Sequence, residues 1–190
     1  AFIFFEGAWS VLQPKIADGT FVIKNSDKAA ALAGKASLSR SEIADIINQV
    51  TTDWNFDVAK KKAADNLTVA KAADKGACYV LAPNDGTARA IADEFAKDPD
   101  VSSYVITGQD AEMASAQYII DGKQTMTVWK NTAILSADAV TMAEEILAGK
   151  KPSTAASYDN GKKQVAAKQT AVTVITKDNV KLLEEANPDW

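Results

Sequence analysis

Apolar runs and helix-like patterns alternate along the chain from end to end. In Phe2–Ile16, apolar residues recur every three or four positions, as on one face of a helix, and Asp18-Gly19 follows as a stop. Tyr79–Ala82 is instead a short continuous apolar run that leads into a turn, which is typical of a buried strand. The same reasoning predicts strands over Phe21–Ile23, Ser103–Thr107, Thr125–Trp129 and Ala171–Ile175, and helices over Phe56–Ala73, Thr87–Ala96, Ala111–Ile120, Leu135–Leu147 and Lys177–Ala186.

This alternation of strands and helices predicts the fold class. Short links between the elements favour an α/β fold with a parallel sheet flanked by helices on both faces. In such sheets, ligands bind just beyond the carboxyl ends of the strands. The stretch "PNDGT" at 83–87 lies at such an end, where the amino terminus of a helix also concentrates partial positive charge.

One segment, Asn25–Val50, does not fit this simple alternation. Ser39 and Glu42 have the spacing of a capping box, and apolar residues follow at helical intervals. We interpret this part as an inserted surface helix. Its lead-in, Ala29–Ser37, is rich in small and polar residues and is expected to be a loop.

Composition and charge then narrow the class of protein. The 190 residues are 47% hydrophobic and 24% charged, with a net charge of −4, which is typical of a globular protein. Lysine and arginine are scattered, so the sequence predicts no nucleic-acid partner and no anionic membrane surface. Cys78 is the single cysteine, which rules out an internal disulfide.

The chemistry of common enzymes has little support in the sequence. The chain has no histidine, which excludes the usual Ser-His and Cys-His pairs and the commonest zinc ligand. It also lacks a phosphate loop and a dinucleotide fingerprint. We therefore expect no enzyme activity, no catalytic residue, no metal and no cofactor. Carboxylates are plentiful, but Asp85 is interpreted as a surface charge in the first turn of a helix.

Four other residues are notable for their positions. Trp54 lies in the polar link "TTDWNFD" just before a helix, and the other three follow strands: Asn84, Asp110 and Lys130. Taken singly, Trp54 could be a hydrophobic staple, Asn84 and Asp110 could be helix caps, and Lys130 could be a surface charge. Together, the amide, carboxylate and ammonium groups can serve both hydrogen-bond directions of vicinal hydroxyls, and an aromatic ring can stack on a sugar.

Several stretches resemble a known family: "GAWSVLQPKIADG", "YVLAPNDGTARAIADEF", "VITGQDAEMASAQYIIDGKQTMTVWK", "SYDNG" and "VITKDNVKLL". They are similar to periplasmic solute-binding proteins of sugar ABC transporters, in the branch of xylose-binding and multiple-sugar-binding proteins. The resemblance covers most of Phe2–Asp189, apart from the inserted Asn25–Val50.

In that family, two α/β lobes joined by three crossing segments close over a sugar. The resemblance implies that Trp54 is the stacking tryptophan, that Asn84 and Asp110 bind sugar hydroxyls, and that Lys130 is a cationic ligand at a hinge strand. It also implies a monosaccharide ligand, the membrane subunits of an ABC permease as partners, and a periplasmic or extracellular location, with a lipoprotein tether as one form of attachment. The calcium loop of some galactose-binding relatives has no counterpart here. Phe5 falls where some relatives place an arginine ligand, which puts that one contact in doubt.

The resemblance further implies that the chain is a carboxyl-terminal fragment, since "AFIFFEGAW" matches a position well inside family members. Residues 1–128 and 173–190 would form the carboxyl-terminal lobe. Residues 131–172 would be an excursion into the otherwise missing amino-terminal lobe, and a second copy of the chain could cover it through self-association.

Two other functions compete with a sugar receptor. The effector-binding core of a LacI-type transcriptional regulator shares this fold, and a preceding helix-turn-helix would favour it, whereas a signal sequence would favour the receptor. "GQDAE" and "GKQTMTVWK" favour the receptor. A small α/β enzyme is the third alternative, and the missing histidine and phosphate loop argue against it.

Overall fold

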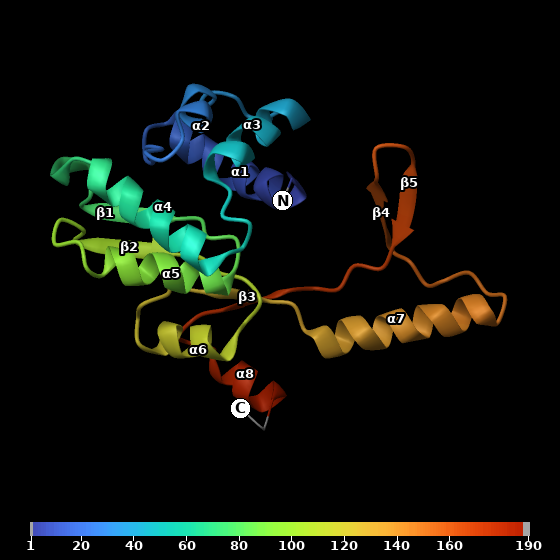
Figure 1. Cartoon of the computed structure of the whole chain (residues 1–190). Coiled ribbons are helices and arrows are strands. Elements are labelled where there is room, and N and C mark those ends of the chain that lie inside the picture. Colours follow the sequence, from blue (N-terminus) through green and yellow to red (C-terminus); the bar gives the residue numbers. More distant parts are fainter. Residues whose placement is uncertain (1, 188–190) are drawn as a thin grey trace. The chain divides into compact units, whose positions relative to one another are not determined.

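The computed structural model describes residues 2–187, which belong to two compact units. One unit comprises Ala1–Cys78 and Asp93–Tyr104, and the other comprises Tyr79–Ala92 and Val105–Trp190. In chain order (Figure 1), the elements are α1 (Phe2–Ala17), α2 (Asp27–Ala31), α3 (Arg40–Val50), α4 (Phe56–Val69), the 3-10 helix η1 (Ala72–Asp74), β1 (Ala77–Val80), α5 (Asp85–Phe95), β2 (Ser103–Ile106), α6 (Met113–Ile120), β3 (Thr127–Trp129), α7 (Thr132–Leu147), β4 (Ala156–Asp159), β5 (Gln164–Ala167), β6 (Thr173–Ile175) and α8 (Lys181–Ala186).

The core of the first unit joins α1 to the inserted segment. Trp9 of α1, Ala29 of α2 and Ile46 of α3 form one buried apolar cluster. The indole Nε1 of Trp9 also donates a hydrogen bond of 2.9 Å to the carbonyl of Lys35. The insertion is therefore packed onto α1 along one face, while its other face remains at the surface.

The predicted capping box of α3 is confirmed. The amide of Glu42 donates to the Ser39 hydroxyl, and the Glu42 carboxylate accepts from the Ser39 amide. The lysine of a neighbouring turn, Lys35, lies 2.6 Å from Glu42 Oε1 and lowers the pKa of this carboxyl to about 2.

Two expectations for the first unit are wrong. Phe21–Ile23 is not a strand, because no strand in residues 2–187 pairs with it; its first amide instead donates to the Lys15 carbonyl, and Ile23 packs into the apolar cluster. The expected loop Ala29–Ser37 begins inside α2, which Ser26 caps by accepting a hydrogen bond from the Ala29 amide.

The strands that follow confirm the α/β class. β1 pairs with β2. The pairing is parallel, because the Ser102 amide donates to Gly76 and, further along both strands, the Thr107 amide donates to Val80. A parallel bridge between Gln109 and Val128 continues the pairing to β3.

The last strand departs from the predicted all-parallel sheet. β6 pairs with β3 in the antiparallel direction, with Val174 opposite Val128. A parallel connection would require a crossover over one face of the sheet. The chain instead returns from a long excursion and enters β6 from the opposite end. The second unit has its apolar core here, formed by Ala111, Ala116, Ile175, Val180 and Leu183.

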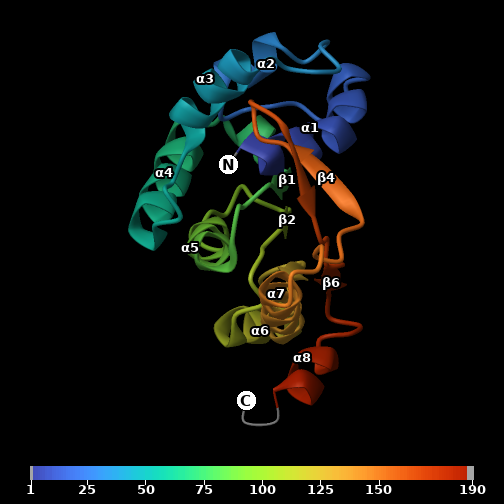
Figure 2. The ribbon, with the colours of Figure 1, turned by 90° about the vertical axis from the view of Figure 1, so that its right-hand side faces the viewer.

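The excursion, residues 131–172, consists of α7 and a hairpin of β4 and β5 that was not predicted. α7 lies across the view in Figure 1 and is seen along its axis in Figure 2. Residues 160–163 form the turn, with Gly161 at φ +84°, where a side chain would be strained. Residues 168–170, which we call the return segment, are tied to α7 by two contacts: Asp138 accepts from Lys168 (2.7 Å) and from Thr170 (3.1 Å).

Candidate functional site

Asn84 follows β1 and lies directly before α5. Its Oδ1 accepts hydrogen bonds from the Thr87 amide (3.3 Å) and the Thr87 hydroxyl (2.7 Å). This is the contact of a helix cap, so that interpretation holds for the oxygen. The side-chain nitrogen donates to none of the residues that the structure describes, and its two N–H groups remain for a ligand.

Asp110 and Lys130 are brought into direct contact. Asp110 follows β2 and Lys130 follows β3, and the Asp110 Oδ1 lies 3.1 Å from the Lys130 Nζ. The side chains remain 40% and 41% exposed, so a ligand can still approach either group. Asp110 does not cap α6, because the capping position is Glu112, whose own side chain makes no capping hydrogen bond.

The segments that carry Asn84 and Asp110 are joined by the backbone. The amide of Asp85 donates to the carbonyl of Gln109 at 2.9 Å. The amide, the carboxylate and the ammonium group therefore follow consecutive strands of one parallel set, as the sequence predicts.

Trp54 belongs to the other unit and precedes α4. The helix is capped by Asn55, whose Oδ1 accepts from the Val58 amide at 3.1 Å. The indole is 57% exposed, which is not the packing of a hydrophobic staple. An exposed indole presents a flat face on which a sugar ring could stack.

The backbone of these two loops is unusual. The described chain has four non-glycine residues at positive φ, and they form two adjacent pairs: Asp53 (50°) with Trp54 (56°), and Asp110 (104°) with Ala111 (54°). Such conformations cost about 1–3 kcal/mol each and occur preferentially at functional sites. Two of the four predicted ligands thus sit in strained backbone, and the other two strained residues are their neighbours.

Next to the ends of these strands lies a network of buried polar side chains that the sequence did not predict. Asp85 is at the start of α5 as expected, but it is fully buried rather than a surface charge. Its carboxylate accepts from the Glu112 amide and from Gln124 Nε2, each at 2.9 Å. Burial raises the pKa of Asp85, and the hydrogen bonds from Glu112, Gln124 and Thr127 oppose that rise. No sequence signal marks this aspartate as buried.

Other sites in the described part of the chain offer less. No cluster of carboxylates and thiols there could hold a metal ion. The pKa of the half-buried Cys78 is raised by burial, which disfavours a reactive thiolate. No helix within residues 2–187 is both long enough and apolar enough to cross a bilayer.

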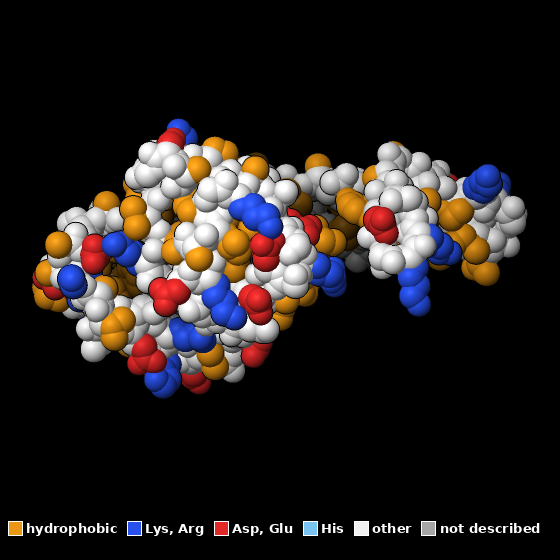
Figure 3. Space-filling model, turned by 90° about the horizontal axis from the view of Figure 1, so that it is seen from above, with side chains coloured by type: hydrophobic (Ala, Val, Ile, Leu, Met, Phe, Trp, Pro, Cys, Tyr) orange, Lys and Arg blue, Asp and Glu red, His pale blue; other side chains and the backbone are white. Residues whose placement is uncertain are grey.

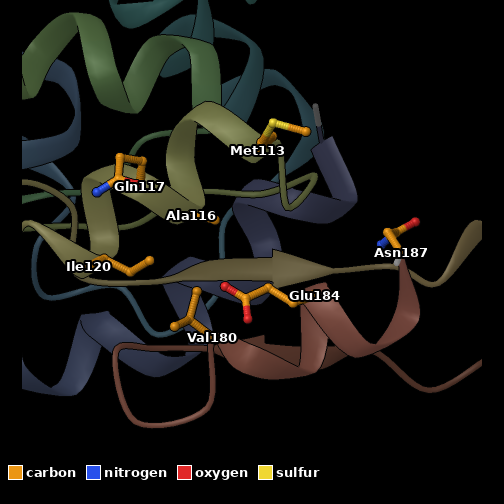
Figure 4. A pocket seen from close by; sticks show the side chains of 7 residues that line it. All are labelled: Met113, Ala116, Gln117, Ile120, Val180, Glu184 and Asn187. Carbon is orange, nitrogen blue, oxygen red and sulfur yellow. The ribbon is translucent and has the colours of Figure 1, made fainter. Parts of the chain in front are cut away.

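One cavity of about 260 Å³ lies between α6 and α8 (Figure 4). Its side chains come from the two helices and from the residues directly before and after α8: Met113, Ala116, Gln117, Ile120, Val180, Glu184 and Asn187. None of the predicted ligands lines it, although three of its side chains are polar: Gln117, Glu184 and Asn187.

Comparison with known proteins identifies relatives over nearly the whole chain. Residues 4–151 match the family described as periplasmic binding protein domain. The chain is 30% identical to the multiple sugar-binding periplasmic receptor ChvE of Rhizobium radiobacter, over 94% of this chain and 48% of that protein. It is 32% identical to the D-xylose-binding periplasmic protein of Escherichia coli, over 54% of this chain and 31% of that protein.

Solved structures give the same picture. A carbohydrate transporter solute binding protein from Chloroflexus aurantiacus, in complex with D-glucose, superposes with a TM-score of 0.94 at 60% identity. The match covers 97% of this chain and 54% of that protein. A solute binding protein from Clostridium phytofermentans with bound β-D-glucose superposes with a TM-score of 0.73 at 25% identity. The chain thus spans about half the length of the multiple-sugar-binding receptor and of these two structures.

Proposed function

Because the chain belongs to the family of periplasmic binding protein domains, we propose that it supplies one lobe of a two-lobed receptor that delivers a monosaccharide to an ABC permease. The names of its relatives specify multiple sugars, D-xylose and D-glucose. We infer a glucose-, xylose- or galactose-like ligand. The relatives' names also support a periplasmic location, and a lipoprotein tether in the periplasm or outside the cell belongs to the same proposal.

The observation that carries this proposal is the strained backbone of the two predicted ligand loops. Positive φ at non-glycine residues is unfavourable and persists only where surrounding contacts impose it. Throughout residues 2–187 it occurs at Trp54, at Asp110 and at one neighbour of each. A fold that needed these loops only as connections would gain stability by relaxing them.

Each polar group has a role that its contacts allow. Asp110 has two carboxylate oxygens and Lys130 has three N–H donors, so both can bind hydroxyls while their ion pair persists. Asn84 acts mainly as a donor, because Thr87 already occupies its oxygen. Trp54 stacks on the apolar face of the sugar ring. Substrate turnover has no role in this scheme, and the proposed receptor needs no cofactor.

The test is a titration of glucose, xylose and galactose into the two-lobed parent protein. Loss of one partner of a buried hydroxyl costs about 1–3 kcal/mol, so Lys130→Met should weaken binding by about tenfold or more. Lys177→Met removes an exposed lysine of the same unit and serves as the matched control. Equal affinities for the two variants would exclude the proposed role of Lys130.

We further propose that residues 131–172 belong with the lobe that this chain does not include. The exposed apolar side chains of α7 then pack on the missing lobe in the parent, and on a second copy when the 190-residue chain is alone. The isolated chain should self-associate and release little or no heat with any of the three sugars. A strictly monomeric elution profile, with α7 strongly protected, would contradict this part, and sub-micromolar sugar binding would contradict the half-site.

A further inference from the structure

The segment after β1, the segment after β2 and the segment that leads into β3 meet at the carboxylate of Asp85, and we call them together the strand-end edge. The side chain is 0% exposed. One oxygen accepts from the Glu112 amide, two residues after Asp110 in the chain, and the other accepts from Gln124, which leads into β3. The residue itself is the neighbour of Asn84. A single buried group therefore contacts all three segments that carry a polar ligand residue.

We propose that Asp85 is a positioning residue of the sugar site, which holds the loop of Asp110 in the arrangement that receives the hydroxyls. This inference rests on the proposed function. Asp85 does not reach the ligand, because its side chain is fully enclosed by protein. It acts through the backbone of the Asp110 loop.

The strain of that loop shows how the positioning works. Three consecutive amides are fixed from the side of the core. The Asp110 amide donates to the Val128 carbonyl (3.0 Å), the Ala111 amide to the Thr127 hydroxyl (3.1 Å) and the Glu112 amide to Asp85 (2.9 Å). Asp110 and Ala111 are the two residues at positive φ, so the contacts hold in place a conformation that the loop alone would leave.

Gly108 makes room for this arrangement. A Cβ at this position would collide with the Asp85 carboxylate and with the Gln124 amide, and would lie 3.1 Å from the Met126 carbonyl. The loop can approach the carboxylate this closely only because residue 108 has no side chain. The packing and the hydrogen bonds thus converge on the same group.

An amide cannot replace the carboxylate here. A carboxylate accepts on both oxygens, whereas an asparagine has one acceptor and one donor group. Asp85→Asn therefore leaves either the Glu112 amide or Gln124 Nε2 facing another donor, or makes the Gln124 side chain turn over so that its oxygen faces the Met126 carbonyl. Ile43→Val is the matched control, because Ile43 is almost as fully buried but lies in α3 of the first unit, away from the Asp110 loop in the chain.

The experiment measures glucose affinity in the two-lobed parent for Asp85→Asn, Asp110→Ala and the double variant. We expect Asp85→Asn to weaken binding about tenfold or more, and Ile43→Val to leave it unchanged. If Asp85 acts through Asp110, the double variant should bind no more than about twofold weaker than Asp110→Ala alone. Wild-type affinity in Asp85→Asn, or additive losses in the double variant, would overturn the positioning role.

Amide hydrogen exchange of the ligand-free protein provides an independent readout. Asp85→Asn should accelerate exchange at Ala111 and Glu112 by about tenfold or more, and Ile43→Val should not. Unchanged exchange would overturn the inference whether or not a sugar binds. Failure of the proposed function has a different signature, because Asp110→Ala would then itself retain the wild-type affinity.

Discussion

Within the second unit, the strand-end edge and the excursion of residues 131–172 are built in opposite ways. At the edge, polar side chains are buried and nearly all of their polar atoms are hydrogen-bonded. These side chains are Asp85, Thr87, Ser115, Gln124 and Thr127. The excursion carries a long helix, α7, of which no residue is buried. At the carboxyl end of α7, Leu147 is 87% exposed and Ile146 is 59% exposed, and orange apolar atoms are visible over this part of the surface in Figure 3.

The contrast shows which parts of the fold this chain can specify on its own. Polar groups at the strand-end edge find their partners within this chain, so this chain alone determines the geometry of the strand-end ligand residues. No residue of α7 is buried against the rest of the described chain, and a helix without tertiary packing is only marginally stable in water. We therefore place the rigid half of the proposed site at the strand ends and infer that α7 requires a packing partner.

The largest expected difference is in hydrogen exchange of the 190-residue chain, measured at a concentration low enough to keep the chain monomeric. Core elements exchange through global unfolding, which costs about 5–15 kcal/mol, whereas an unpacked helix opens locally at almost no cost. Amides of α7 should therefore exchange at least about a thousandfold faster than those of α6 or β3. Equal protection of α7 and α6 would show that the excursion is stable without a partner, and the comparison would fail.

Gly108→Ala should produce the next largest effect. Forcing a methyl group into a filled site costs about 1–3 kcal/mol, and here the added Cβ meets backbone as well as Asp85. Gly86→Ala is the matched control. It lies one residue after Asp85 in the first turn of α5, its nearest neighbour would be 3.7 Å away, and alanine favours a helix.

Chemical denaturation of the two glycine variants measures this difference. The Gly108 variant should lose stability, and the Gly86 variant should keep or slightly gain it. A loss of the same size in both would mean that the crowding around Asp85 is not specific to residue 108.

The smallest predicted effect is a loss of stability of the excursion at low pH. A hydrogen bond from Lys168 lowers the pKa of Asp138 from its ordinary value of 3.8, so this contact stabilises the folded excursion above that pH and is lost as the pH falls through the lowered value. The pKa of Asp85 is raised from 3.8, so its ionised form costs stability at higher pH and that cost disappears as the pH falls. Acid should therefore loosen the return segment before it weakens the edge.

Hydrogen exchange at residues 168–170 across this pH range measures the effect, after correction for the intrinsic rates. Asp138→Asn should reduce protection of the segment at neutral pH and remove most of the further loss in acid. If the variant and the wild-type chain showed the same pH dependence, Asp138 would not be the group responsible.

Much of the fold could be predicted because periodicity and strand ends are local signals. α1, α3, α4, α5, α7 and the strands β1, β2, β3 and β6 lie within a few residues of the predicted positions. The direction of β6 could not be predicted, since it depends on where a long excursion returns. The hairpin of β4 and β5 had a usable signal in Asn160-Gly161, a dipeptide that favours tight turns.

The candidate site was predictable in part for the same reason. Asn84, Asp110 and Lys130 each follow a strand, so their common edge could be inferred from the order of elements. The burial of Asp85 could not, because an aspartate in the first turn of α5 has the same local sequence features whether it faces water or Gln124. The positive φ of Trp54 and Asp110 likewise depends on contacts with distant residues.

The most direct test of the central claim is the glucose affinity of the two-lobed parent after Asp110→Asn, a change that keeps the shape of the side chain and removes its charge. Asp121→Asn, at an exposed aspartate after α6, is the matched control. We predict that Asp110→Asn weakens binding by about tenfold or more while the ligand-free melting temperature stays close to that of the control. Unchanged affinity in Asp110→Asn, combined with a clear loss of stability, would contradict the claim that the strand ends bind the sugar and would mark Asp110 as a structural residue.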